Sequence, residues 1–306
     1  MKAPTAIVAV ALMAVSLGAR AQADINENAG TRAVPFLKME SGSRAAAMAG
    51  AYTGLADDAD GLFWNPAGLA GIAAKQLTGT QNFSFGGINH ETVAYARRLT
   101  EKGVGAVSFQ GAFAEIERRL GDTEEADSLF TASTYGFGLS YSHALSDLAV
   151  GGTLKLLQER FDIENHTGVA IDVGALYNAD DYSVGVSVLS LGPELDDSAL
   201  PLTLRAGGSA MLADDGPLAV ADIVLPNDDD LSVRVGLEQW FFDQVALRVG
   251  YHVTGAENPN KGFALGLGLK SEGTKSLEHV EFELDYAFIP EDGIADAHRV
   301  SFITRF

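Results

Sequence analysis

The sequence predicts an all-β fold: a transmembrane antiparallel β-barrel of about 14 strands, with a short helical plug at its N-terminus. Three observations lead to this prediction. The chain begins with an export signal, it alternates apolar and polar residues from about Lys75 onward, and it ends on an aromatic residue, Phe306. They divide the chain into residues 1–23 as signal peptide, 24–74 as plug segment and 75–306 as barrel.

The first 23 residues have the pattern of a secretory signal peptide. Lys2 precedes an apolar stretch over residues 6–17, and small residues then stand at Ala19, Ala21 and Ala23. About 12 apolar residues at about 1.5 Å each cannot cross a hydrocarbon core of about 30 Å, so a membrane helix is not expected. Cleavage is predicted after Ala23. The chain has no cysteine, so we expect neither a lipoprotein anchor nor a disulfide.

The composition excludes several kinds of partner. The net charge is −20, and loss of Lys2 and Arg20 with the signal peptide leaves 41 acidic against 19 basic residues, a charge of −22. Such a chain would repel the phosphates of nucleic acid, and it offers no basic patch for anionic lipid. After residue 23, no apolar stretch approaches the roughly 18 residues of a membrane helix.

Apolar and polar residues alternate with a period of two along the predicted strands. Tyr135, Phe137 and Leu139, for example, are separated by Gly136 and Gly138. Charged residues keep to one face, which we expect to point into the lumen: Asp172, Arg205, Arg234, Glu238, Arg248, Glu281, Glu283 and Asp285. A soluble β-sandwich could show the same alternation. Strands of about ten residues, near the length that crosses a bilayer at a tilt, favour the barrel.

Fourteen strands are predicted, an even number that places both ends of the barrel on the periplasmic side. The longest surface loop is expected around residues 115–128. The strands are expected near residues 75–84, 90–99, 103–114, 128–143, 147–161, 166–177, 181–191, 201–213, 217–226, 230–240, 243–253, 262–270, 277–289 and 296–306.

The last strand ends on a free aromatic carboxyl terminus. Phe306, Thr304, Phe302, Val300 and His298 share one face of it, which we expect to face lipid. This resembles the terminal signal that the outer-membrane assembly machinery recognises, and Phe302 and Phe306 are its candidate residues. The alternative is an ordinary closing strand that happens to end on Phe.

Residues 24–74 break the strand pattern. A run of small residues after Ser43 predicts a short helix with Ser43 as its N-cap, and Asn65 with Pro66 predicts the start of a second. Since a barrel of this size leaves a lumen, we expect the segment to fill it. The residues assigned to this plug motif are Ser43, Arg44, Ala47, Gly50, Asp57, Asp58, Asn65, Pro66 and Gly68. A disordered or periplasmic extension is the alternative.

The stretch FLKMESGSRAAAMAGAYTGLADDADGLFWNPAGLAGI, residues 36–72, resembles the N-terminal hallmark of the PorV/PorQ family of outer-membrane proteins. That family lies within the broader class of barrels similar to the fatty-acid transporter FadL. The resemblance implies a role in type IX-like secretion and surface assembly of exported proteins. The alternative is FadL-like transport of hydrophobic small molecules through a plugged barrel with a lateral opening. The short chain and the modest loop at 115–128 weaken the hypothesis of a role in secretion.

Catalytic and metal chemistry find no support in the sequence. The six histidines are scattered over separate predicted strands and turns, and no HxxxH or HExxH pair occurs. The acidic runs at residues 57–60 and 228–230 lack the spacing of a calcium loop. We therefore expect no enzyme activity, cofactor or metal. The expected partners are outer-membrane lipid, lipopolysaccharide, the assembly machinery, and either secretion-system proteins or a hydrophobic solute.

Overall fold

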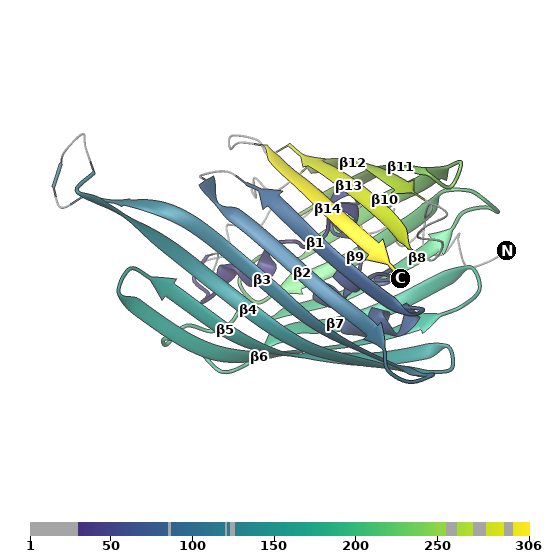
Figure 1. Cartoon of the computed structure of the whole chain (residues 1–306), viewed down its shortest axis with the longest axis horizontal. Helices are drawn as coiled ribbons and strands as arrows, with labels where there is room; N and C mark the ends of the chain where they lie inside the picture. Colours follow the sequence, from purple (N-terminus) through teal and green to yellow (C-terminus); the bar gives the residue numbers. More distant parts are fainter. Residues whose placement is uncertain are drawn as a thin grey trace.

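The computed structural model describes residues 30–84, 87–119, 121–122, 126–254, 262–271, 280–290 and 296–306. The predicted signal peptide and its cleavage point lie outside these residues. Fourteen antiparallel strands pair in sequence order, and β1 pairs with β14 to close the barrel (Figure 1). Within the described residues, no helix is long and apolar enough to cross a membrane. The predicted fold class and strand number are confirmed.

The strand boundaries fall within about four residues of those predicted. The strands are β1 (Lys75–Phe83), β2 (Asn89–Arg98), β3 (Gly103–Arg118), β4 (Ser128–Leu145), β5 (Leu148–Phe161), β6 (Glu164–Asn178), β7 (Tyr182–Leu191), β8 (Thr203–Met211), β9 (Leu218–Pro226), β10 (Ser232–Phe241), β11 (Val245–Val253), β12 (Gly262–Ser271), β13 (Glu281–Ile289) and β14 (Ala297–Arg305). We call the end where β1 begins and β14 ends the proximal end, and the opposite end the distal end.

Four strands are longer than the rest and extend the wall at the distal end. These are β3 to β6, which rise beyond their neighbours on one side of the barrel (Figure 1). The predicted loop at residues 115–128 was therefore too long, because residues 115–118 continue β3 and pair with residues 128–131 of β4. The ladder continues because each added pair satisfies further backbone amides and carbonyls.

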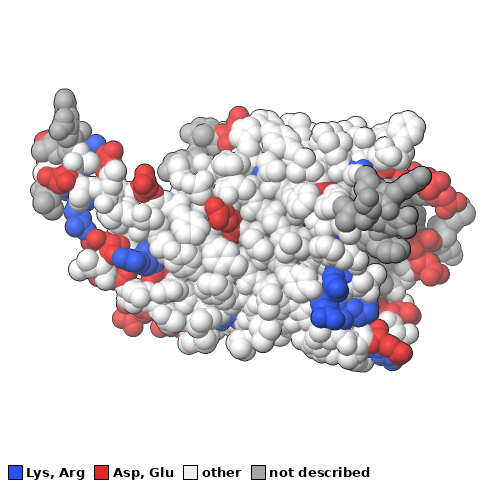
Figure 2. Space-filling view, in the orientation of Figure 1, with Lys and Arg blue, Asp and Glu red and all other residues white. Residues whose placement is uncertain are grey.

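The wall presents its apolar side chains outward. In β11, Leu247 and Val249 are 50% and 43% exposed, whereas Arg248 between them points inward and is 3% exposed. The visible wall is largely uncharged (Figure 2). In water so much exposed apolar surface would be unfavourable, whereas hydrocarbon lipid accommodates it. This arrangement is the reverse of a soluble sandwich, which buries its apolar face.

The final strand follows the expected facing with one exception. Val300, Phe302 and Phe306 are exposed on the outer face, whereas Thr304 is only 4% exposed despite its outward parity. Thr304 stands between two large cross-strand partners, Phe282 of β13 and Leu77 of β1, beside which its short side chain has little exposed surface. The backbone N–H of Phe306 donates to the carbonyl of Lys75, which extends the closing ladder by one residue.

The described part of the plug segment, residues 30–74, lies inside the barrel as four short helices: η1 (Pro35–Lys38), α2 (Ser43–Ala47), η2 (Ala59–Phe63) and η3 (Pro66–Gly71). Asn65 caps η3 by accepting from the Ala67 N–H at 3.1 Å, and Pro66 occupies the first turn as predicted. The N-cap of α2 is Gly42 rather than Ser43. Ser43 instead donates its backbone N–H to the Ser301 hydroxyl of β14 at 2.6 Å, so the wall satisfies that amide.

A charge on the outer wall should destabilise the barrel in proportion to its depth. Leu284 lies outward in the middle of β13, and Leu284→Arg should lower the free energy of unfolding by about 2–4 kcal/mol. Leu231, equally exposed but in the β9–β10 loop, is the control, and Leu231→Arg should cost about 0–1 kcal/mol. Denaturant unfolding in lipid vesicles measures both. Equal costs would contradict the assigned facing.

Removal of Phe306 should impair assembly without affecting export. The residue is 48% exposed on the face that it shares with Phe302, where a recognition factor can reach it. A chain lacking Phe306 should accumulate in the periplasm with its signal peptide removed, as cell fractionation and immunoblotting would show. Phe302→Leu, with Phe306 intact, serves as the milder comparison. Normal outer-membrane levels of the truncated chain would remove the basis for an assembly signal in this strand.

Candidate functional site

The plug lies against the inner wall at places where the strands carry glycine. A Cβ built at Gly151 of β5 would lie 2.5 Å from the Pro66 carbonyl, and one at Gly236 of β10 would lie 2.6 Å from the Met48 Cβ. Similar close approaches to the plug occur at Gly174, Gly185, Gly250 and Gly266. Small plug residues such as Ala47, which is fully buried, were expected to allow this contact. The matching glycines on the wall were not foreseen.

Two glycines within the plug are required by its own packing. Gly50 has φ +73°, and a Cβ there would collide with the side chains of Arg234 and Glu40. Gly68 lies against the carbonyl of Ala56, where no side chain fits. Both residues belong to the motif singled out in the sequence, and the motif therefore encodes the compact path of this segment.

Arg44 joins the plug to the barrel wall through a chain of charges that are buried apart from the half-exposed Asp57. Its Nε and Nη2 donate to the two carboxylate oxygens of Glu238 on β10, both at 2.8 Å, and its Nη1 donates to Asp57 at 2.5 Å. The Tyr52 hydroxyl donates to Asp58 at 2.7 Å, and Asp58 also accepts from the Gly61 N–H. A bidentate Arg–carboxylate pair of this kind fixes orientation as well as position.

The same chain of charges continues along the wall. Arg248 of β11 donates to Glu238 at 2.6 Å and pairs with Asp285 and, at 3.4 Å, with Glu283 on β13. Arg305 pairs with Glu283 at 2.7 Å. Asp285 points into the lumen and is completely buried, because the plug fills this part of the lumen.

The middle of the plug is held by a second buried pair. Asp222 of β9 accepts from the backbone N–H groups of Tyr52 and Thr53 and pairs with Arg205 of β8 at 3.0 Å. Arg205 also donates to the carbonyl of Gly50 at 2.6 Å. Since every one of these groups is buried, displacement of the plug would leave charges unpaired at a high energetic cost.

The remaining predicted lumen charges are placed as follows. Asp172 of β6 is fully buried and pairs with Lys155 of β5 at 2.6 Å. Glu281 lies at the proximal rim with its side chain 43% exposed, where it pairs with Lys270 at 3.3 Å and with Arg305 at 3.8 Å. Arg234 faces the distal half of the lumen, where it pairs with Glu40 of the plug.

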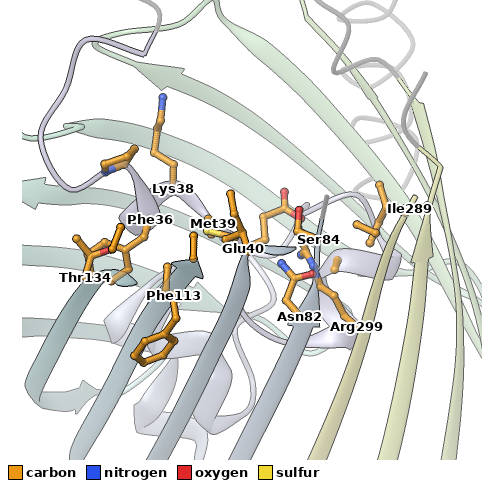
Figure 3. A pocket seen from close by; sticks show the side chains of 18 of the residues that line it. Phe36, Lys38, Met39, Glu40, Asn82, Ser84, Phe113, Thr134, Ile289 and Arg299 are labelled. Atoms are coloured by element: carbon orange, nitrogen blue, oxygen red, sulfur yellow. Dashed lines mark hydrogen bonds and ion pairs between the residues drawn. The ribbon is translucent and has the colours of Figure 1, made fainter. Parts of the chain in front are cut away.

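A cavity of about 560 Å³ opens above the plug at the distal end. Phe36 and Met39 of the plug and Ile289 of β13 contribute apolar side chains, together with small residues of the wall such as Ala112 and Ala264. Glu40, Asn82, Ser84 and Arg299 gather on one side of it, across from Phe36 and Thr134 (Figure 3). The volume and the largely apolar lining are those of a small-molecule site.

Glu40 lines both this cavity and a second one of about 250 Å³, which lies on the β7–β10 side. Arg234 and Arg299 both donate to its carboxylate, Arg299 at 3.0 Å. Burial opposes ionisation of Glu40, but the two guanidinium groups outweigh it and lower the pKa of Glu40 to about 2. Glu40 is therefore charged at neutral pH, and the two guanidinium groups hold it in place.

Among the described strand pairs, one register shift is found, and it lies next to the second cavity. It falls between Ile171 and Val173 of β6, and β7 pairs only with the proximal half of β6, residues 171–178. Ser190 at this bulge has φ +60° and donates its N–H to Asp172 at 2.7 Å. The β7–β8 loop covers the unpaired part of β6 with Leu195 and Leu200. Loop packing, rather than a hydrogen-bonded strand, closes this part of the wall.

Sequence reasoning missed the residues around the distal cavity. Arg299 and Asn82 have inward parity in their strands, which an alternation argument could have detected. Glu40 had no such signal, because it lies in an irregular segment whose position depends on the whole barrel. Among the described residues, no group of three His, Asp or Glu side chains is arranged to bind a metal.

A family model described as Uncharacterised protein family (UPF0164) matches residues 8–175, more than half of the chain. The chain belongs to this family. The match covers the plug motif and the first strands, but it does not show membership of the PorV/PorQ family. No curated protein matches the chain in sequence.

Solved structures of FadL-like barrels share the fold. The toluene transporter TbuX of Ralstonia pickettii aligns with a TM-score of 0.62 at 12% identity, over 88% of this chain and 99% of that chain. The toluene transporter TodX of Pseudomonas putida gives 0.59 at 13% identity, over 86% and 96%. A FadL homologue of Pseudomonas aeruginosa gives 0.59 at 10% identity, also over 86% and 96%. Because the sequence identities are this low, these similarities establish a common fold and no more.

A side chain added at a wall glycine should displace the plug. Gly250→Ala would place a Cβ against the backbone of Met48 and Ala49, and the overlap should raise ion conductance in planar bilayers, since an emptied lumen passes water. Gly79→Ala on β1 is the control, because its Cβ would meet nothing closer than 3.9 Å. If both variants conduct like the unmodified protein, the plug is not held by this contact.

Proposed function

We propose that this chain is an outer-membrane barrel that lets small hydrophobic molecules pass into the cell. The observation that carries the proposal is the distal cavity, a largely apolar chamber of about 560 Å³ at the barrel mouth, directly above the plug. The common fold with the two toluene transporters supports it. An aqueous pore for polar solutes is disfavoured, because the plug fills the lumen below the cavity.

The same proposal places the barrel in the bacterial outer membrane after removal of a signal peptide. The apolar belt outside the strands would contact lipid, and the distal loops would contact lipopolysaccharide. Insertion would use the assembly machinery that reads the terminal strand. With an even strand number, the proximal end faces the periplasm and the cavity opens toward the outside.

The route out of the cavity would run sideways rather than through the plug. Unseating the plug would break the buried Arg44–Glu238 and Arg205–Asp222 pairs, whereas the β7–β8 loop is held by apolar packing around Leu195 and Leu200. An apolar molecule could replace these apolar contacts at little cost in free energy. It would then leave beside the unpaired half of β6, in keeping with the lateral opening that the FadL resemblance implies.

Secretion and surface assembly of exported proteins is the second candidate. The motif over residues 36–72, with its resemblance to PorV and PorQ proteins, favours it. The motif residues mostly serve to pack the plug against the wall, which either function would require. A cavity of small-molecule size is of no evident use to a protein cargo. We assign no enzymatic activity or cofactor to the barrel.

Filling the cavity should block uptake. Ala114 of β3 lines the chamber, and Ala114→Trp should reduce uptake of a radiolabelled monoaromatic hydrocarbon by whole cells several-fold. Val107→Trp is the matched control, since Val107 lies on the outer face of the same strand and is 54% exposed. Surface levels of each variant are checked by immunoblot. Unchanged uptake together with lost display of a surface protein would favour the secretion function instead.

A further inference from the structure

The distal cavity carries polar groups on one side that a hydrocarbon cannot use. Asn82 of β1 and Arg299 of β14 are direct cross-strand partners, and both line the cavity. They are only 2% and 8% exposed. In Figure 3 they lie beside Glu40 and Ser84, away from the apolar side formed by Phe36.

Each of these two side chains keeps one buried atom without a hydrogen-bond partner among the described residues. For Asn82 it is the acceptor Oδ1, and for Arg299 it is the donor Nε. Leaving a buried polar group unpaired costs about 1–3 kcal/mol, so two on neighbouring positions indicate a missing partner. Side chains directly opposite each other are about 5 Å apart at their Cβ atoms, close enough for one small group to meet both.

We propose that this pair forms a polar subsite that recognises the hydroxyl group of an otherwise apolar molecule, such as an alkylphenol or a long-chain alcohol. A hydroxyl can donate to Asn82 Oδ1 and accept from Arg299 Nε at the same time. The apolar body would then lie against Phe36, Met39 and Ile289. The inference rests on the proposed function, because it names the class of solute that the same cavity selects.

Neither a hydrocarbon nor a carboxylate fits the subsite as well. A hydrocarbon leaves both polar atoms unpaired. A carboxylate has only acceptor oxygens, which would oppose Asn82 Oδ1. The guanidinium of Arg299 is also already paired with Glu40 at 3.0 Å, and Arg234 pairs with the same carboxylate. Glu40 thus reduces the attraction that these two arginines would offer to an anion.

Binding of three matched ligands to the purified full-length barrel tests the subsite. The probes are 4-pentylphenol, pentylbenzene and 4-pentylbenzoate, measured by equilibrium dialysis against protein-free micelles of the same detergent. We expect the phenol to bind about tenfold more tightly than the hydrocarbon, and the benzoate more weakly than the phenol. Equal affinity for phenol and hydrocarbon, or tightest binding of the benzoate, would overturn the proposal.

Substitutions at two positions of β1 test whether the tighter binding of the phenol depends on Asn82. Asn82→Leu should remove the advantage of the phenol over pentylbenzene. The control is Thr80→Val, on the same face of β1 but outside the cavity, which should keep the advantage. If Asn82→Leu does not assemble, Asn82→Ala replaces it: this smaller variant also lacks the acceptor, so it should lose the phenol's advantage. Retention of that advantage would count against the subsite.

The outcomes separate this inference from the proposed function. If cells take up the hydrocarbon and the barrel binds it as tightly as the phenol, transport stands and the subsite is wrong. If none of the three probes is bound or taken up, the proposed function fails as well.

Discussion

The closed hydrogen-bond ladder is the constraint from which the rest of the structure follows. With β14 paired to β1, every strand has two neighbours, so the paired backbone groups of the wall are satisfied without water and the outer face can be apolar. Closure with fourteen strands also leaves an interior too wide for the wall's own side chains to fill. The N-terminal segment occupies that interior, and the cavities are the space that it leaves at the distal end.

The contact between plug and wall depends on small size on both sides and on charges that neither side could bury alone. Glycines on the inner face admit the plug backbone, as at Gly236 against Met48. Arg44 then reaches Glu238 inside the wall, where both are nearly free of solvent. Such a pair is stable only in this geometry, so it specifies the seating of the plug more than it adds net stability.

The sequence predicted the wall much better than the site. A period of two is a local property, so strand number, facing and most boundaries could be read from residues such as Tyr135 and Phe137. Burial of Asp285 could not, since it depends on plug atoms more than two hundred residues away in the chain. The cavity is less predictable still. Glu40, Asn82 and Arg299 come together only when the barrel closes, and their spacing in the sequence does not indicate that they meet.

The ion pair between Glu40 and Arg299 and the hydrogen bond from Ser43 to Ser301 connect the first part of the described chain to its last strand. The plug segment therefore lacks part of its binding site until β14 is in place. Complete seating of the plug thus requires a closed barrel, and closure of the wall and filling of the lumen depend on the same strand.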